Sequence, residues 1–250
     1  MVESNTQGPW HDRAALNRNA AERKAVIPTA TDVTPMSTHE DLQQIVDSGV
    51  IAVLRGVERD DVVDVADALI EGGVTTLEVT ADTPSAIDSI GDLADRYADR
   101  DDVLVGAGTV LDAETARAAL LAGAEFVVSP STHEDVIETC NRYGAVVAPG
   151  VATPTEAVEA YQAGADVLKL FPASDLGPSF LSSVKGPLGQ VPIIPTGGVG
   201  PDNAGEFIEA GAVAVGAGGS LIDDEAIAAG DFGVLTENAE ELVAAVEDAK

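Results

Sequence analysis

The feature that most constrains the fold is a short apolar run that recurs about every 20–28 residues along most of the chain. Near-continuous apolar runs of this kind are typical of parallel strands that are covered on both faces. We expect strands at Val50–Leu54, Thr75–Val79, Val103–Val105, Phe126–Val128, Ala145–Ala148, Val167–Phe171, Ile193–Ile194 and Val213–Val215.

The segments between these runs have the periodicity of amphipathic helices. In Asp61–Glu71, for example, the apolar side chains fall on one face and the acidic side chains on the other. Two S-x-x-E patterns, Ser37–Asp41 and Ser131–Asp135, predict capping boxes at helix starts. Glycine, the usual residue after a helix end, closes four of the segments, at Gly72-Gly73, Gly123, Gly164 and Gly211.

Eight strands that alternate with helices predict a (β/α)8 barrel, the TIM barrel, formed by residues 36–250 as a single domain. The alternative is a doubly wound open sheet. Such a sheet places a Gly-rich phosphate loop after its first strand, whereas the glycines of this chain gather after the last two predicted strands. The position of the glycines therefore favours the barrel.

Charge sets the first 35 residues apart from the rest. The chain has 250 residues and a formal net charge of −30, from 43 acidic and 13 basic side chains. Residues 1–35 contain four acidic and four basic residues, so the whole net charge lies in residues 36–250. We expect residues 1–35 to be a disordered or loosely attached extension, with a helix over about residues 10–25 as the alternative. Met36 is a candidate natural start.

The strong negative charge argues against nucleic acids and anionic membranes as partners. At about 1 M salt the Debye length falls to about 3 Å, so the self-repulsion of such a chain is screened in a halophile's cytoplasm. No apolar run reaches the roughly 20 residues of a membrane span, and the N-terminus lacks a secretory signal. We therefore expect a cytoplasmic protein. The single cysteine, Cys140, is expected to be buried and structural.

Two ionisable residues stand inside predicted strands. Lys169 interrupts the run Val167–Phe171, and Glu78 interrupts the run Thr75–Val79. Burial disfavours the charged form of an amine, and a neutral amine can attack a carbonyl group. Alternate strands of a barrel contribute to the same interior layers, so Glu78 and Lys169 can meet across its centre. The sequence thus predicts a nucleophile beside a general acid–base, with a buried ion pair without chemistry as the alternative.

Two Gly-rich segments follow the last two predicted strands, at residues 195–199 and 216–220. In such barrels a phosphate group is commonly bound at this place, because glycines let backbone N–H groups approach the anion. No metal site is expected, since a catalytic metal needs several converging ligands. The chain has three histidines, of which His11 lies in the extension and His39 and His133 lie in the predicted capping boxes.

Five motifs together resemble those of the 2-dehydro-3-deoxy-phosphogluconate (KDPG/KHG-type) aldolase family. They are Ile-Ala-Val-Leu-Arg-Gly (51–56), Leu-Glu-Val-Thr (77–80), Val-Gly-Ala-Gly-Thr-Val (105–110), Leu-Lys-Leu-Phe-Pro-Ala (168–173) and Pro-Thr-Gly-Gly-Val (195–199). The resemblance implies a homotrimeric class I aldolase that needs no metal or cofactor. It would cleave 2-dehydro-3-deoxy-6-phosphogluconate to pyruvate and D-glyceraldehyde 3-phosphate in an Entner–Doudoroff-type pathway.

The resemblance also implies roles for individual residues. Lys169 corresponds to the Schiff-base lysine and Glu78 to the proton-transferring carboxylate. Substrate contacts are implied for Arg55, Thr109, Pro130 and Phe171, and phosphate contacts for Gly197, Gly198, Gly218, Gly219 and Ser220.

One position departs from the family pattern. Many members have an arginine four residues after the catalytic glutamate, where this chain has Asp82. An acid cannot bind the substrate carboxylate, so Arg55 is expected to do so alone. The departure leaves the 6-phosphogalactonate epimer as an alternative substrate. A barrel isomerase or synthase without a covalent step and a non-catalytic sugar-phosphate sensor are the remaining alternatives.

Overall fold

The computed structural model describes residues 38–250. The predictions for residues 1–35, for Met36 and for a capping box begun by Ser37 lie outside the described residues. Within the described part, all named strands pair in parallel. The strands are β1 (Val50–Leu54), β2 (Thr76–Thr80), β3 (Leu104–Gly108), β4 (Phe126–Val128), β5 (Val146–Ala148), β6 (Gly150–Val151), β7 (Leu168–Leu170), β8 (Ile193–Pro195) and β9 (Val215–Ala217).

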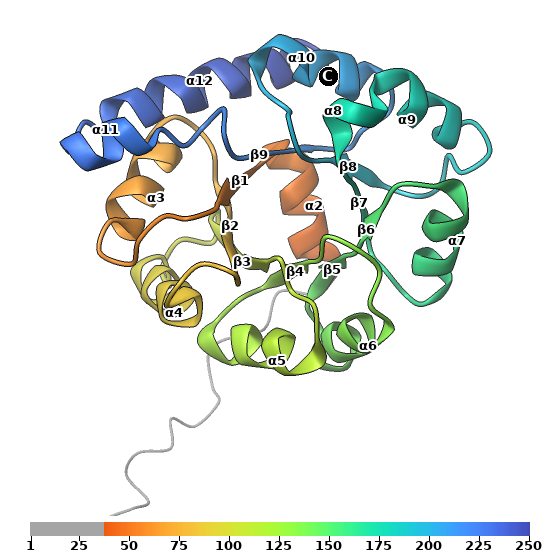
Figure 1. Ribbon diagram of the computed structural model, residues 1–250, viewed down its shortest axis with the longest axis horizontal. Coiled ribbons are helices and arrows are strands. Elements are labelled where there is room, and N and C mark those ends of the chain that lie inside the picture. Colours follow the sequence, from red (N-terminus) through yellow and green to blue (C-terminus); the bar gives the residue numbers. More distant parts are fainter. Residues whose placement is uncertain (1–37) are drawn as a thin grey trace, which may run out of the picture. The chain divides into compact units, whose positions relative to one another are not determined.

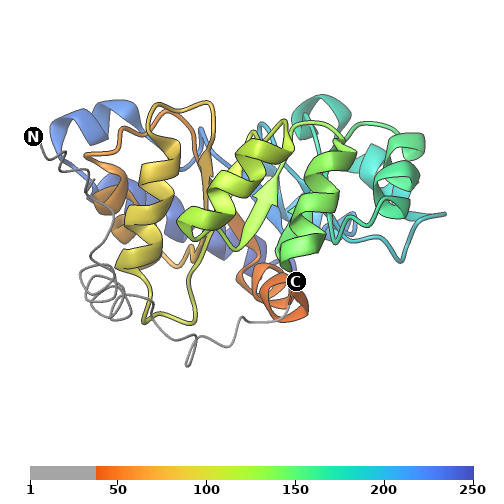
Figure 2. The same cartoon turned by 90° about the horizontal axis from the view of Figure 1, so that it is seen from below.

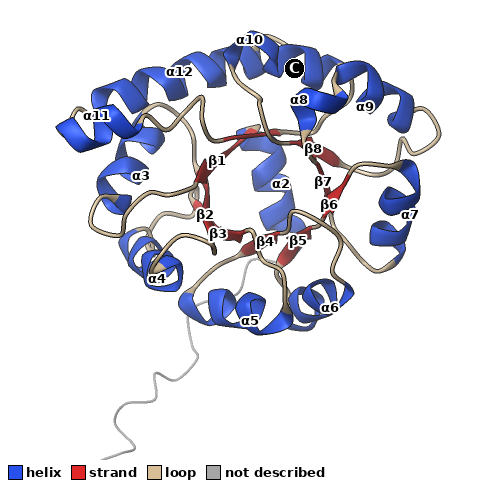
Figure 3. Cartoon of the chain, in the orientation of Figure 1, coloured by secondary structure: helices blue, strands red, loops and turns tan. Residues whose placement is uncertain are grey.

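The strands form two curled sheets. One has the order β5-β4-β3-β2-β1-β9 and the other the order β6-β7-β8. A parallel bridge between Thr196 and Gly216 links the end of β8 to β9. At the other seam, the carbonyl of Val147 accepts hydrogen bonds from the amides of Asp166 and Val167, at 3.2 and 3.4 Å. Figures 1 and 3 show the strands curling about a common axis with the helices outside them.

Helices cover the outer face of the strands and one end of the ring. They are α2 (Thr38–Ser48), α3 (Val62–Glu71), α4 (Ala86–Arg96), α5 (Ala113–Ala122), α6 (Glu134–Tyr143), α7 (Pro154–Gln162), α8 (Ala173–Leu176), α9 (Pro178–Lys185), α10 (Pro201–Glu209), α11 (Asp224–Ala229) and α12 (Gly233–Glu247). In Figure 2, α2 (orange-red) lies at the opposite end of the strands from α8 and α11. Helix α2 leads into β1, so it covers the N-terminal ends of the strands and leaves their C-terminal ends open.

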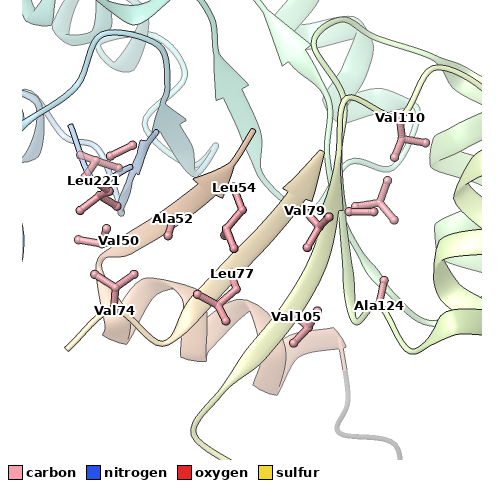
Figure 4. Packing of buried hydrophobic residues seen from close by; sticks show 14 of the residues in the cluster. Val50, Ala52, Leu54, Val74, Leu77, Val79, Val105, Val110, Ala124 and Leu221 are labelled. Carbon is pink, nitrogen blue, oxygen red and sulfur yellow. The ribbon is translucent and has the colours of Figure 1, made fainter. Parts of the chain in front are cut away.

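Apolar side chains fill the space on both faces of the strands. The outer layer, between strands and helices, includes Val50, Leu54 and Leu77 (Figure 4). A second cluster combines residues of several strands, among them Phe126, with Ile45 of α2. A Cβ atom at Gly106 would lie 2.5 Å from three ring carbons of Phe126. Glycine at this position therefore leaves the room that the aromatic ring needs.

Several predicted boundaries differ from the structure. The strand expected at Val213–Val215 is β9, two residues later, and the strand expected at Val103–Val105 extends to Gly108 in β3. Strand β6 was not predicted. The capping box at Ser131–Asp135 is wrong: α6 begins at Glu134, and the Ser131 hydroxyl bonds to His133 Nε2 at 2.9 Å.

Candidate active site

Lys169 and Glu78 lie together inside the strand ring. Lys169 is the central residue of β7 and Glu78 the central residue of β2, two strands on opposite sides of the ring in Figure 3. Both side chains are buried, and Lys169 Nζ lies 4.0 Å from Glu78 Oε1. The structure thus brings together the two residues that the strand pattern singled out.

Glycine on the neighbouring strand makes room for the Glu78 carboxylate. Strand β3 runs beside β2, with Gly106 opposite Glu78 and Gly108 opposite Thr80. A Cβ atom at Gly108 would overlap the Glu78 carboxylate. A side chain at this position would therefore displace the carboxylate from its place beside Lys169.

The environment of Glu78 favours its protonated form. Burial raises the pKa of this carboxyl group, while the positive charges of Lys169 and Arg55 oppose the rise without cancelling it. Among the described residues, Oε1 of Glu78 has no hydrogen-bond partner. A carboxyl group with a raised pKa and an unpaired oxygen can both accept and return a proton at moderate pH.

Arg55, Asp82 and Thr109 follow the C-terminal ends of strands β1, β2 and β3. Arg55 comes directly after β1, and Thr109, which has a φ of 57°, comes directly after β3. Arg55 Nη1 forms an ion pair with the Asp82 carboxylate, and Nη2 donates a 2.9 Å hydrogen bond to Thr109 Oγ1. The contact between Arg55 and Asp82 was not predicted from the sequence.

The two Gly-rich segments lie at the ends of β8 and β9. Gly197 and Gly198 have φ angles of 93° and 75°, a conformation that other residues rarely adopt. The Ser220 hydroxyl donates a 2.9 Å hydrogen bond to the carbonyl of Val199. This bond links the segment of residues 216–220 to the segment of residues 195–199. The amide of Ser174 in α8 donates to the carbonyl of Gly197 at 2.9 Å. Both segments thus lie at the open end of the ring.

A cavity of about 590 Å³ opens beside the ring, with Pro130 and Phe171 in its lining. Gly150, which also lines it, pairs with Lys169 in the register of β6 and β7. The Lys169 amine lies 5.3 Å from the centre of the Phe171 ring. Neither Lys169 nor Glu78 lines the cavity. Pro130 and Phe171 therefore border a space next to the amine rather than the buried pair itself.

Between residues 38 and 250, no three His, Cys, Asp or Glu side chains are grouped so that they could hold a metal ion. None of the helices in this range combines the length and apolar character that a membrane crossing requires. Cys140 is buried, and burial raises the pKa of its thiol to about 12. Burial and a raised pKa both agree with the structural role expected for this cysteine.

Comparison with known proteins decides the family. The model of the KDPG and KHG aldolase family matches residues 42–237. The chain belongs to this family. It is 38% identical over 161 residues to the 2-dehydro-3-deoxy-6-phosphogalactonate aldolase of Escherichia coli K12, which covers 64% of this chain and 78% of the relative. It is 40% identical over 160 residues to the 2-dehydro-3-deoxy-phosphogluconate aldolase of Treponema pallidum, with 64% and 75% covered.

A solved structure gives the same assignment. The KDPG aldolase of Legionella pneumophila, with pyruvate captured as a covalent carbinolamine intermediate, superposes with a TM-score of 0.74 at 31% sequence identity. The match covers 80% of this chain and 96% of the Legionella chain. The present chain is therefore an aldolase by family.

Proposed function

We propose that the chain is a class I aldolase that forms a Schiff base through Lys169. Its substrate is 2-dehydro-3-deoxy-6-phosphogluconate, which it cleaves to pyruvate and D-glyceraldehyde 3-phosphate in an Entner–Doudoroff-type pathway. The observation that carries the proposal is the buried amine of Lys169, 4.0 Å from the Glu78 carboxylate. The covalent pyruvate adduct in the Legionella relative supports the same chemistry.

The reaction proceeds through a covalent intermediate. The lone pair of the deprotonated Lys169 amine adds to the C2 carbonyl of the substrate, and the resulting carbinolamine takes up a proton and loses water to give an iminium ion. Glu78 takes the proton of the C4 hydroxyl, the C3–C4 bond breaks, and its electrons move to the iminium to give an enamine. After the aldehyde leaves, Glu78 returns the proton to C3 and regenerates the iminium ion, and water adds at C2 to release pyruvate, a proton and the free Lys169 amine. The raised pKa of Glu78 suits a group that both takes and returns a proton.

The remaining site residues are assigned to binding. Arg55 and Thr109, hydrogen-bonded to each other, bind the pyruvate moiety at its carboxylate. Pro130 and Phe171 border the substrate from the cavity side. The phosphate binds to the backbone at the ends of β8 and β9, through Gly197, Gly198, Gly218, Gly219 and Ser220. Backbone N–H groups at glycines suit an anion because no side chain blocks their approach.

The proposed architecture is a closed (β/α)8 barrel. The hydrogen bonds at both seams support closure, with β5 and β6 acting as one strand interrupted at Pro149. The proposed assembly is a homotrimer, as in the family that the motifs resemble. Mass measurement in solution by light scattering tests the assembly, because a trimer has three times the 25.4 kDa of one chain.

The gluconate epimer is proposed over the galactonate epimer, although relatives of both names match the chain. The deciding experiment measures kcat/KM for the two phosphorylated epimers by the pyruvate released, with and without EDTA. We expect the gluconate compound to be preferred, Lys169→Ala to be inactive, and EDTA to have no effect. A preference for the galactonate compound would reverse the assignment of the substrate epimer. Strong inhibition by EDTA would contradict the amine mechanism and favour a metal-dependent one.

A further inference from the structure

The Arg55–Asp82 pair forms part of a hydrogen-bonded network across the ends of three strands. Arg55 follows β1, Asp82 follows β2 and Thr109 follows β3. Asp82 accepts from Nη1 of Arg55, and Thr109 Oγ1 accepts from Nη2 at 2.9 Å. The guanidinium group is thus held from two sides, by groups on two different strand ends.

Asp82 itself is anchored. Burial raises the pKa of its carboxyl group, but a hydrogen bond from Thr80 and the charge of Arg55 outweigh this, so the pKa is lowered. The Thr80 hydroxyl lies 2.9 Å from the Thr83 hydroxyl, which accepts a 3.1 Å hydrogen bond from the amide of Gly56. The residue that follows Arg55 is therefore fixed by the same turn that holds Asp82.

The guanidinium group keeps donors for a ligand. An arginine has five N–H donors, and the two bonds to Asp82 and Thr109 use one on each terminal nitrogen. Among residues 38–250, the remaining donors have no side-chain acceptor. Thr109, the hydrogen-bond partner of Arg55, directly follows Gly108, and a Cβ atom at Gly108 would overlap the Glu78 carboxylate. A carboxylate bound at Arg55 therefore lies near the Lys169–Glu78 pair.

We infer that Asp82 is a positioning residue that holds Arg55 in the orientation in which it binds the carboxylate of the 2-keto acid. The inference rests on the proposed function. Arginine is long and exposed here, and ordering such a side chain on binding costs affinity. Asp82 and Thr109 impose that order before the substrate arrives, so one arginine is enough at this site.

A competing interpretation makes the opposite prediction. If Asp82 only occupied Arg55 as a substitute anion, its removal would free the guanidinium group and strengthen carboxylate binding. Positioning predicts instead that removal weakens binding, by about 2- to 10-fold for one long side chain that must be ordered. The sign of the change in affinity therefore separates the two.

The experiment measures pyruvate binding on the full-length chain. Borohydride reduces the pyruvate adduct, and intact mass measures the fraction of chains that carry it. The quantity compared is the pyruvate concentration that gives half-maximal labelling. The variants are Asp82→Asn, Asp82→Glu, Arg55→Ala and the double variant Arg55→Ala/Asp82→Asn. Asp92→Asn is the matched control, because Asp92 pairs with Arg59 in another exposed Arg–Asp pair away from the site. Circular dichroism is used to check that each variant is folded.

We expect Asp82→Asn to raise the half-labelling concentration about 2- to 10-fold while maximal labelling at saturating pyruvate stays the same. Asp82→Glu should recover part of the loss, and Asp92→Asn should match the wild type. In the Arg55→Ala background, Asp82→Asn should have no further effect, because its influence passes through Arg55.

An unchanged or lower half-labelling concentration in Asp82→Asn would overturn the inference, as would an equal effect with and without Arg55. In both cases the proposed function would still stand if pyruvate labels the wild-type protein. If pyruvate does not label the wild-type protein at all, the proposed function is contradicted, and the inference fails with it.

Discussion

Lys169 Nζ and Glu78 Oε1 lie 4.0 Å apart in the interior of the strand ring, although the two residues come from β7 and β2. A buried ion pair that serves only stability needs close contact and further hydrogen bonds to offset its desolvation. Here the distance is long, and Oε1 has no hydrogen-bond partner among the described residues. The arrangement favours a pair that is left open for a substrate over a pair that closes on itself.

Glu78→Gln keeps the size of the side chain and removes its ability to exchange a proton. Because general acid–base groups contribute about 10²–10⁴ in rate, kcat should fall by about this factor. Labelling by pyruvate and borohydride should persist, since Lys169 is intact. Steady-state kinetics and intact mass measure the two effects, and an unchanged kcat would remove Glu78 from the mechanism.

The same carboxyl group should set the acid limb of the pH profile. Glu78 must be ionised to take the C4 proton, and burial raises its pKa above the ordinary 4.5. Activity should therefore fall as pH decreases through a value higher than 4.5, and the residual activity of Glu78→Gln should lack this limb. A wild-type limb at or below the ordinary value would contradict the assigned environment.

Gly108→Ala tests the space around Glu78. The added methyl group would overlap the Glu78 carboxylate, so the carboxylate must move and kcat should fall. Gly91→Ala in α4 is the control: a Cβ there meets only the Ala122 carbonyl, at 3.8 Å, and alanine favours a helix by about 1 kcal/mol. The control should keep kcat and gain stability in thermal unfolding. Equal kcat in both variants would show that β3 does not confine Glu78.

The position of the reacting pair could be predicted because each residue breaks an apolar run. A charged residue between Leu168 and Leu170, or between Leu77 and Val79, is costly in a covered strand unless it is paired or takes part in chemistry, and alternate strands share interior layers. By contrast, β6 was missed because Pro149 interrupts the run and Gly150 adds no apolar side chain. The pairing of Asp82 with Arg55 depends on two strand ends that only the folded chain brings together.

Local hydrogen bonds explain the other errors. The S-x-x-E pattern at Ser131 failed because the serine hydroxyl bonds to the His133 ring instead of a helix amide. The last strand was placed early because Val213 and Ala214 are as apolar as β9 itself and precede it. Periodicity identifies that an element exists, whereas side-chain hydrogen bonds and register decide where it begins.

Removal of the substrate phosphate should reduce catalytic efficiency. The backbone N–H groups at Gly197–Gly198 and Gly218–Ser220 would be left without their anion, and a hydrogen bond to a charged group contributes about 1.5–3 kcal/mol. We expect kcat/KM for the unphosphorylated acid to be at least about tenfold lower. Equal efficiency for the two acids would show that these glycines do not bind phosphate.

Salt should increase both activity and stability. The acidic side chains behind the net charge of −30 repel one another, and assembly of several copies would bring more of them together. At about 1 M salt the Debye length is about 3 Å, so the repulsion is largely screened. Activity and the thermal midpoint should therefore rise from low salt to molar KCl. A maximum at low salt would contradict a halophilic origin.

Reductive trapping of pyruvate tests the central claim most directly. Lys185 is the internal reference: its amine donates hydrogen bonds to the carbonyls of Gly189 and Val191, at 3.1 and 2.8 Å, so it is engaged elsewhere. After incubation with pyruvate and borohydride, peptide mass analysis should find the label on Lys169, and Lys169→Ala should take no label. Label on Lys185, or an unlabelled wild type, would contradict the Schiff-base mechanism.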